Sequence, residues 1–189
     1  MKEKKVQTLL ILLLIGGLSV TPSLPGPMRL QVEQALAADG AEGLKKQAKE
    51  ALQRLSSALA NPLSRVDVNA INGGLEKFVS AAAKKGNPID FGIGVVNKDG
   101  VAIAGRYVVG EFRRDDFSSY RFFKESSKNK KRVQERIYFK DGSQLLVLSS
   151  PLVGKKNVIG AIVLGFQPTE VKRKYGVTPE QFLNIDFNK

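Results

Sequence analysis

The sequence contains no cysteine, no histidine and no tryptophan among its 189 residues. Without cysteine there is no disulfide, thiolate zinc site or thiolate nucleophile, and without histidine there is no Ser-His-Asp triad. The other side chains form no nucleophile–base pair and no cluster with metal-ligand spacing, and Gly154-Lys155-Lys156 lacks a full phosphate-loop pattern. The adjacent pair Asp115-Asp116 is better explained as a helix cap than as a metal or acid/base site. We therefore predict a protein that is not an enzyme and holds no cofactor.

Long apolar runs are also missing, except for one stretch near the N-terminus from Leu9 to Val20, which follows three lysines among the first five residues. A positive start and a short apolar core are the signature of a secretory signal, and a membrane span needs about 20 residues. The best cleavage motif is Ala35-Leu36-Ala37. We therefore predict a signal peptide over residues 1–37 and a single domain over 38–189. The motif lies far from the apolar core, so an uncleaved anchor is the alternative, and the protein is expected to be periplasmic or secreted, released or tethered once.

Acidic residues are few: 18 Asp and Glu stand against 30 Lys and Arg, which gives a net charge of +12. Such a field favours anionic membrane surfaces, nucleic acid or acidic ligands, and also solubility. The basic runs have few interleaved aromatics, which indicates first a solvated face and second a weak association with an anionic membrane surface. Nucleic acid is not expected as a partner, because export separates the chain from it.

The chain is organised around residues 89–110, where two apolar β-type runs flank the turn Asn97-Lys98-Asp99-Gly100. Large side chains alternate with small ones along these runs. Phe91, Ile93 and Val95 would share one face, whereas the other face carries Gly92, Gly94, Ala102 and Ala104. A face of small residues in a sheet indicates the close approach of a helix, a backbone or a ligand, and close helix packing is the favoured interpretation.

Helices and strands are predicted on both sides of this hairpin. A helix is expected to begin at the capping pattern Asp39-Gly40-Ala41-Glu42 and to end at Asn61-Pro62, and a second to run from about Gly74 to Lys85. After the hairpin, Asp116 or Ser118 is expected to cap a short helix bearing Tyr120. The remaining predicted elements are strands Val133–Phe139, Leu145–Ser149 and Val158–Phe166, a loop Pro151–Asn157 and a final helix Pro168–Tyr175.

Three segments, Phe91–Gly100, Asp116–Phe123 and Val158–Phe166, together with the leading helix, resemble the extracytoplasmic Cache sensor domains, which share a PAS-like fold. The resemblance covers roughly residues 42–175. It implies an α+β fold, with a five-stranded antiparallel sheet, a long N-terminal helix on one face and short helices over the other. It also implies a small-molecule pocket under the short helices. Such domains usually sit between two membrane spans and feed an output module, and the sequence contains neither a second span nor an output domain.

Candidate ligand-binding residues come from the hairpin, the short helix and the later strands. A guanidinium can bind a carboxylate through two parallel hydrogen bonds, and a tyrosine adds a hydroxyl on an apolar ring. Ordinary surface arginines and half-buried tyrosines are the alternative explanation. The candidates are Arg106, Tyr107, Tyr120, Arg121, Tyr138 and Ser149.

This set suits a small organic acid or an amino acid as ligand. We predict a free-standing periplasmic binding component of sensor type, which passes its ligand state to a membrane-bound signalling partner. The alternative is a structural or adaptor protein that uses the same fold to bind another protein. That alternative predicts a filled sheet without a pocket and a large apolar surface patch.

Overall fold

The structure is a computed structural model that describes residues 26–107, 114–155 and 157–189, with side chains from residue 38 onward. The chain divides into two compact units, residues 1–35 and 36–189, and the second contains the sheet. Within the described ranges, no helix combines the length and apolar character that crossing a membrane requires. The elements are α2 (Gly26–Ser64), α3 (Val68–Lys84), β1 (Gly92–Asn97), β2 (Ala102–Arg106), α4 (Arg121–Asn129), β3 (Val133–Tyr138), β4 (Gln144–Val153), β5 (Val158–Phe166), α5 (Pro168–Tyr175) and α6 (Pro179–Asn184).

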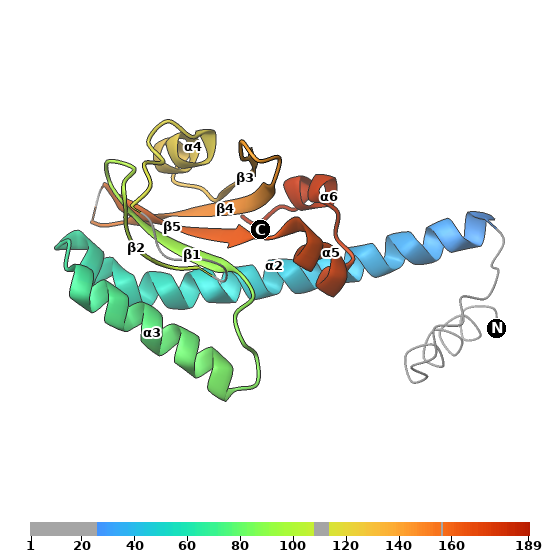
Figure 1. Cartoon of the computed structure of the whole chain (residues 1–189), viewed down its shortest axis with the longest axis horizontal. Helices are drawn as coiled ribbons and strands as arrows, with labels where there is room; N and C mark the ends of the chain where they lie inside the picture. The colour runs from blue at the N-terminus through green and yellow to red at the C-terminus, as the bar shows by residue number, and fades with distance from the viewer. Residues whose placement is uncertain (1–25, 108–113, 156) are drawn as a thin grey trace. The chain divides into compact units, whose positions relative to one another are not determined.

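The five strands form one sheet in the order β2-β1-β5-β4-β3, and every neighbouring pair is antiparallel. The central strand β5 is apolar along its length and is covered on both sides, as its sequence predicts. Helices α2 and α3 lie on one face of the sheet, and the short helix α4 lies on the other (Figure 1). The predicted fold class is therefore confirmed.

The larger core lies between the sheet and the helices α2 and α3. The apolar stripe of α2 meets the face of β1 that carries Phe91, Ile93 and Val95. Leu52, with 1% of its surface exposed, and Leu55, with none, are typical of this stripe. Burial of a leucine side chain stabilises a fold by roughly 1.5–3 kcal/mol, so this stripe is a main source of stability. The C-terminal helices α5 and α6 add their apolar residues to the same core.

The helices do not pack on the small-residue face, and this prediction is wrong. They pack on the face with the large side chains, because Phe91, Ile93 and Val95 bury their apolar surface against the apolar residues of α2 and α3. Gly92 and Gly94 point to the opposite side, towards α4. Ala104 is a further correction, since an irregular register between β1 and β2 places it with Val95 in the helix-side core.

The helix limits also differ from those predicted. Helix α2, described from Gly26, runs through the Asp39 pattern instead of starting there, because residues 28–39 contain no proline or glycine that would interrupt it. It ends at Ser64, with Pro62 inside its last turn. Helix α3 begins at Val68 rather than Gly74, since Asp67 caps it by accepting a hydrogen bond from the backbone N–H of Ala70 at 3.0 Å.

Residues 1–25 of the predicted signal peptide and Lys156 lie outside the described residues. The predicted cleavage motif at residues 35–37 lies within α2. Cleavage at this motif stays a prediction.

Strand β4 continues to Val153, although a loop is predicted from Pro151 onward. Pro151 is tolerated inside this strand because β3, its neighbour on one side, begins only at Val133, opposite Ser149. Beyond that pair, one edge of β4 has no partner strand in the described part of the sheet, and prolines are tolerated at such edges. Helix α6 was not predicted, although Thr178 and Gln181 form a complete capping box at its start.

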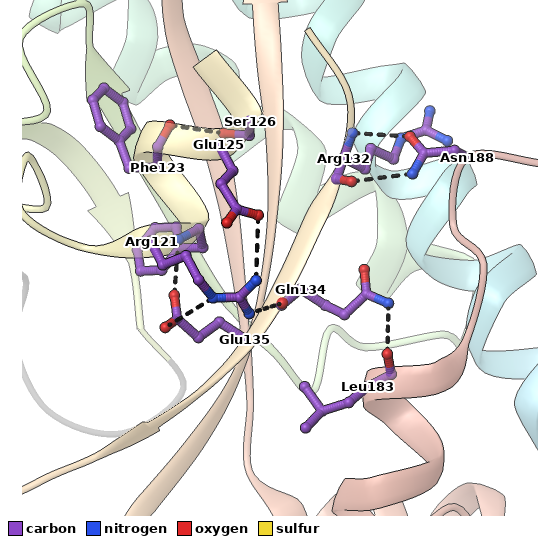
Figure 2. A network of polar contacts seen from close by, with 10 residues as sticks. Arg121, Phe123, Glu125, Ser126, Arg132, Gln134, Glu135, Leu183 and Asn188 are labelled. Atoms are coloured by element: carbon purple, nitrogen blue, oxygen red, sulfur yellow. Dashed lines mark hydrogen bonds and ion pairs between the residues drawn. The ribbon is translucent and has the colours of Figure 1, made fainter. Parts of the chain in front are cut away.

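The C-terminal segment is tied to β3 by polar contacts (Figure 2). The backbone N–H of Arg132 donates to the side-chain oxygen of Asn188 at 2.9 Å, and the Asn188 amide donates back to the Arg132 carbonyl at 3.1 Å. The Gln134 amide donates to the carbonyls of Leu183 and Ile185. These bonds hold Phe182 and Phe187 in the helix-side core.

Candidate functional site

A cavity of about 560 Å³ lies between the sheet and the segment that leads into α4. Pockets for small molecules usually measure roughly 300–1,000 Å³ and combine apolar walls with a few polar groups. The cavity's position is the one that the resemblance implies for a ligand. It is lined by Asp90, Gly92, Gly94, Tyr107, Asp115, Asp116, Phe117, Tyr120, Phe122, Ile137, Phe139, Leu145, Val147, Val163, Gly165 and Gln167.

Glycines on two neighbouring strands make the floor of the cavity. Gly92 pairs with Gly165 across β1 and β5, and Gly94 pairs with Val163. A Cβ atom built on Gly92 or Gly94 would approach its nearest neighbour at 3.7 Å, which is ordinary van der Waals contact. Packing therefore does not require glycine at these two positions, and the missing side chains leave space for a guest.

Aromatic rings form the wall nearest α4. Phe117, Tyr120 and Phe122 contact one another with ring centroids 5.6–5.7 Å apart. Phe122 is fully buried and seats α4 on the sheet, whereas 36% of Tyr120 is exposed. Phe139, just after β3, also lines the cavity and is 48% exposed. Such rings offer an apolar surface and a negative face to a cationic guest.

The polar groups of the cavity are mainly acidic. Three carboxylates line it, those of Asp90, Asp115 and Asp116, and the described lining residues include no basic side chain. Lys174, outside the lining, pairs with Asp90 at 2.7 Å and offsets part of its charge. Burial raises the pKa of Tyr107, and the charge of Asp115 and a hydrogen bond to its carboxylate raise it further. Tyr107 therefore stays protonated at neutral pH. The lining favours a guest with a positive charge, because a carboxylate attracts a cation strongly in a partly desolvated site.

Asp116 does not cap α4, contrary to the prediction, and neither does Ser118. Asp116 instead accepts a hydrogen bond from the backbone N–H of Ser118 at 2.8 Å, which closes a turn. Hydrogen bonds from the hydroxyl and backbone of Ser118 lower the pKa of Asp116, so its carboxylate stays ionised in mild acid. The N-cap residue of α4 is Tyr120, whose side chain makes no capping bond.

Helix α4 is held to the sheet by contacts with β3, which Figure 2 shows, and with β4. The Glu135 carboxylate accepts the backbone N–H of Phe122 at 2.8 Å and so replaces a local cap. Arg121 donates to Glu125 and to the Gln134 carbonyl, both at 3.2 Å. Under the helix, the hydroxyls of Ser126 and Ser149 lie 2.9 Å apart, and both residues are fully buried. These contacts position the aromatic wall.

The structure brings two of the six candidate residues to the cavity, Tyr107 and Tyr120. That Tyr107 and Tyr120 contact a ligand stays a prediction.

The other four candidates lie outside the cavity lining. Arg106 is opposite Ile93, whose side chain is in the helix-side core, and cross-strand partners share a face. Arg121 binds acidic partners beside α4, and Ser149 is buried beneath this helix. Tyr138 alternates with Ile137 and is 64% exposed.

Sequence reasoning missed the acidic character of the cavity. Asp90 follows Pro88 in a segment with no regular pattern, and Asp115 adjoins a residue that suggested a cap. Gln167 was not among the candidates. One signal was available for the floor, namely the alternation of glycine with large apolar residues from Phe91 to Val95.

The comparison with solved structures shows which fold this is. The ligand-binding domain of the Campylobacter jejuni chemoreceptor Tlp3, solved in complex with L-valine, matches with a TM-score of 0.57 at 13% identity over 81% of this chain. The ligand-binding domain of the Pseudomonas aeruginosa PAO1 amino-acid chemoreceptor PctC, solved in complex with GABA, matches with a TM-score of 0.56 at 15% identity over 78% of this chain. The chain has the fold of a Cache sensor domain.

This chain spans less than two thirds of the length of the receptor domains that it matches. The match covers 65% of the Tlp3 domain and 62% of the PctC domain. No family model matches the sequence, and no curated protein matches it. At identities this low, the likeness establishes the arrangement of the helices and strands. It does not establish the ligand or the partner of this chain.

Proposed function

We propose that this chain is an exported, non-catalytic ligand-binding domain of sensor type, and that its cavity takes a small amine-bearing ligand, either an amino acid or an amine. The observation that supports this most is the combination of a glycine floor with carboxylates at the wall of a 560 Å³ cavity. An ammonium group would lie near Asp115 or Asp90, and an apolar body would lie on the rings of Phe117 and Tyr120. An organic acid without an amine lacks this attraction.

Several of the matching structures were solved with a ligand, and these ligands support the same class. The Tlp3 domain was solved with L-valine and with isoleucine bound, and the PctC domain with GABA. Each of these compounds has an amino group. The ligand of this chain is chosen by its own lining residues, which is why we propose the chemical class and not a particular compound.

We further propose that the ligand acts by a shift of population between two positions of α4. A guest in contact with Tyr120 favours the conformation in which this residue closes on the cavity. Arg121 adjoins Tyr120 and binds Glu125 and Glu135, so it transmits that movement to the outer surface of α4 and β3. A membrane-bound signalling partner would bind this surface. In this scheme the chain works as a free-standing periplasmic component, either released or tethered at its N-terminus.

The alternative, a structural or adaptor protein with the same fold, predicts a filled sheet. A cavity of this size disfavours it. Weak attachment to an anionic membrane remains compatible with either role, because it depends on the basic surface and not on the cavity.

A thermal-shift experiment with three matched compounds tests the proposed ligand class. L-Valine carries both charges, isobutylamine lacks the carboxylate, and isovalerate lacks the amine. We expect the first two to raise the unfolding temperature and isovalerate to leave it unchanged, because binding to the native state alone stabilises it. Asp115→Asn should abolish most of this stabilisation. Asp99→Asn, at an exposed turn away from the cavity, is the matched control and should retain it. Stabilisation by isovalerate alone would contradict the proposal.

A further inference from the structure

A second hollow, a groove of about 770 Å³, lies on the helix side of the sheet. Its walls come from the exposed face of α2, the end of α3, the segment that precedes β1, and the last turn of α5. Asp90 is the one described residue that lines both this groove and the cavity under α4. We call this second hollow the basic groove, because its charged lining residues are Lys46, Arg54, Lys85, Arg173 and Lys174, with the carboxylates of Glu50 and Asp90.

Two of the basic side chains already have acidic partners. Lys174 lies 2.7 Å from a carboxylate oxygen of Asp90, and Arg173 lies 2.6 Å from one of Glu170. Lys46, Arg54 and Lys85 are exposed, and no ion pair joins them to any other described residue. Positive charges that converge on a concave surface focus their field on the same volume and raise the local concentration of anions.

The floor of the basic groove is apolar. Phe78 and Ile89 are half-buried there, and Phe91 and Ala51 are buried beneath them. Lysines on a plain solvated surface have no such floor, and this difference separates the groove from the other basic runs of the chain. Cationic rims above an apolar floor suit a guest that is both anionic and partly apolar.

The groove walls are held in place from both sides. The hydroxyl of Tyr175 donates a hydrogen bond to the side-chain oxygen of Gln47, which joins α5 to α2. The ion pair between Lys174 and Asp90 joins α5 to the segment before β1. These two contacts fix the position of the α5 wall before a guest binds, so that ordering this wall adds little to the cost of binding.

We propose that the basic groove is a second ligand site, which binds a soluble organic anion with an apolar body, such as an aromatic carboxylate or phosphate. Lys46, Arg54 and Lys85 supply the charges for the anion, and Phe78 and Ile89 contact the apolar body. The proposal does not depend on the ligand of the cavity, since the two hollows have opposite charges and share only Asp90 among their described lining residues.

An amide NMR titration with benzene-1,3,5-tricarboxylate tests the proposal, with the neutral benzene-1,3,5-trimethanol as the matched compound. We expect saturable shifts at the amides of Ala82, Gly86 and Asn87 with the tricarboxylate, and at least about tenfold weaker binding of the neutral compound, because exposed charges supply the difference. The dissociation constant should rise with added salt. Saturable shifts outside the groove alone, or equal binding of the two compounds, would overturn the proposal.

Two double variants show whether particular lysines matter. Lys46→Gln/Lys85→Gln removes two charges from the groove, and Lys77→Gln/Lys124→Gln removes two exposed charges elsewhere. All four side chains are exposed, so both proteins should unfold at the temperature of the parent chain. The groove variant should bind the tricarboxylate about five- to tenfold more weakly, and the control within about twofold of the parent. Equal losses in the two variants would show attraction by net charge alone and overturn the site.

Lipid headgroups share the anionic chemistry, and vesicles distinguish them from a soluble guest. The protein is sedimented with phosphatidylglycerol vesicles, and with phosphatidylcholine vesicles for comparison. We expect any binding to phosphatidylglycerol to fall equally in the two double variants, as for a diffuse basic surface. Binding that depends on Lys46 and Lys85, together with no binding of the tricarboxylate, would overturn the soluble ligand and assign the groove to a membrane headgroup.

Discussion

The cavity under α4 and the basic groove differ in the sign of their charge. Three carboxylates line the cavity without any basic side chain among its described residues, whereas five basic residues line the groove. A chain with a net charge of +12 thus keeps an acidic pocket on one side of its sheet. The comparison teaches that net charge describes the outer surface and does not predict the preference of an internal site.

The two faces of the sheet also differ in how tightly they are packed. On the helix side, a Cβ atom on Gly160 would collide with the Val96 carbonyl oxygen and lie 2.7 Å from a methyl group of Leu63. On the cavity side, a Cβ atom on Gly94 meets nothing closer than 3.7 Å. One glycine is therefore required by the fold, and the other leaves an empty volume.

The largest effect is expected from alanine substitutions at these two glycines. Gly160 has a φ of 155°, so Gly160→Ala combines backbone strain with a collision and should lower the free energy of unfolding by roughly 2–4 kcal/mol. Gly94→Ala should change it by less than about 1 kcal/mol. Urea denaturation measures both values. Equal losses at the two positions would mean that the cavity face is packed as tightly as the helix face.

A smaller effect, with opposite signs in the two regions, is expected for Asp90→Asn. This change removes a carboxylate from the cavity and releases Lys174 from its ion pair into the groove. Isobutylamine should bind the cavity about two- to fivefold more weakly, and benzene-1,3,5-tricarboxylate should bind the groove more tightly by a similar factor, as is typical of partly exposed pairs. Calorimetric titrations give both constants. Two changes in the same direction would contradict the opposite charges assigned to the two hollows.

The smallest effect concerns the pKa of Tyr107 in the cavity. Burial and the carboxylate of Asp115 both raise this pKa, so Asp115→Asn should lower it while leaving it above the ordinary value, since the burial remains. Ultraviolet absorbance during an alkaline titration, with Tyr107→Phe to identify the signal, measures the shift. An unchanged pKa in Asp115→Asn would show that the two residues do not interact and that the acidic wall is misplaced.

The strands and their order of appearance could be predicted from local patterns, and the site could be predicted only in part. The alternation from Phe91 to Val95 correctly separates large from small residues, but it does not say which face meets the helices. That choice depends on the volume between the sheet and α2, which involves residues far apart in the sequence. Likewise, Asp90 and Lys174 are 84 positions apart, and no local pattern connects them.

The candidate residues illustrate the same limit. Tyr107 and Tyr120 were selected as tyrosines near the hairpin and the short helix, and both line the cavity. Arg121 was selected for its guanidinium, but Glu125 and Glu135 already occupy it. Glu135 lies on β3, and its ion pair with Arg121 could be recognised only once the position of this strand beside α4 was known.

The most direct test of the central claim is an amide NMR titration of the parent chain with isobutylamine and, separately, with isovalerate. The cavity floor contains Gly92, Gly94 and Gly165, so a guest in the cavity must disturb the amides of these glycines. We predict saturable shifts of all three with isobutylamine and none with isovalerate. Glycine amides that do not move at any concentration of the amine, in a protein that remains folded, would contradict the claim that this face of the sheet holds a small cationic guest.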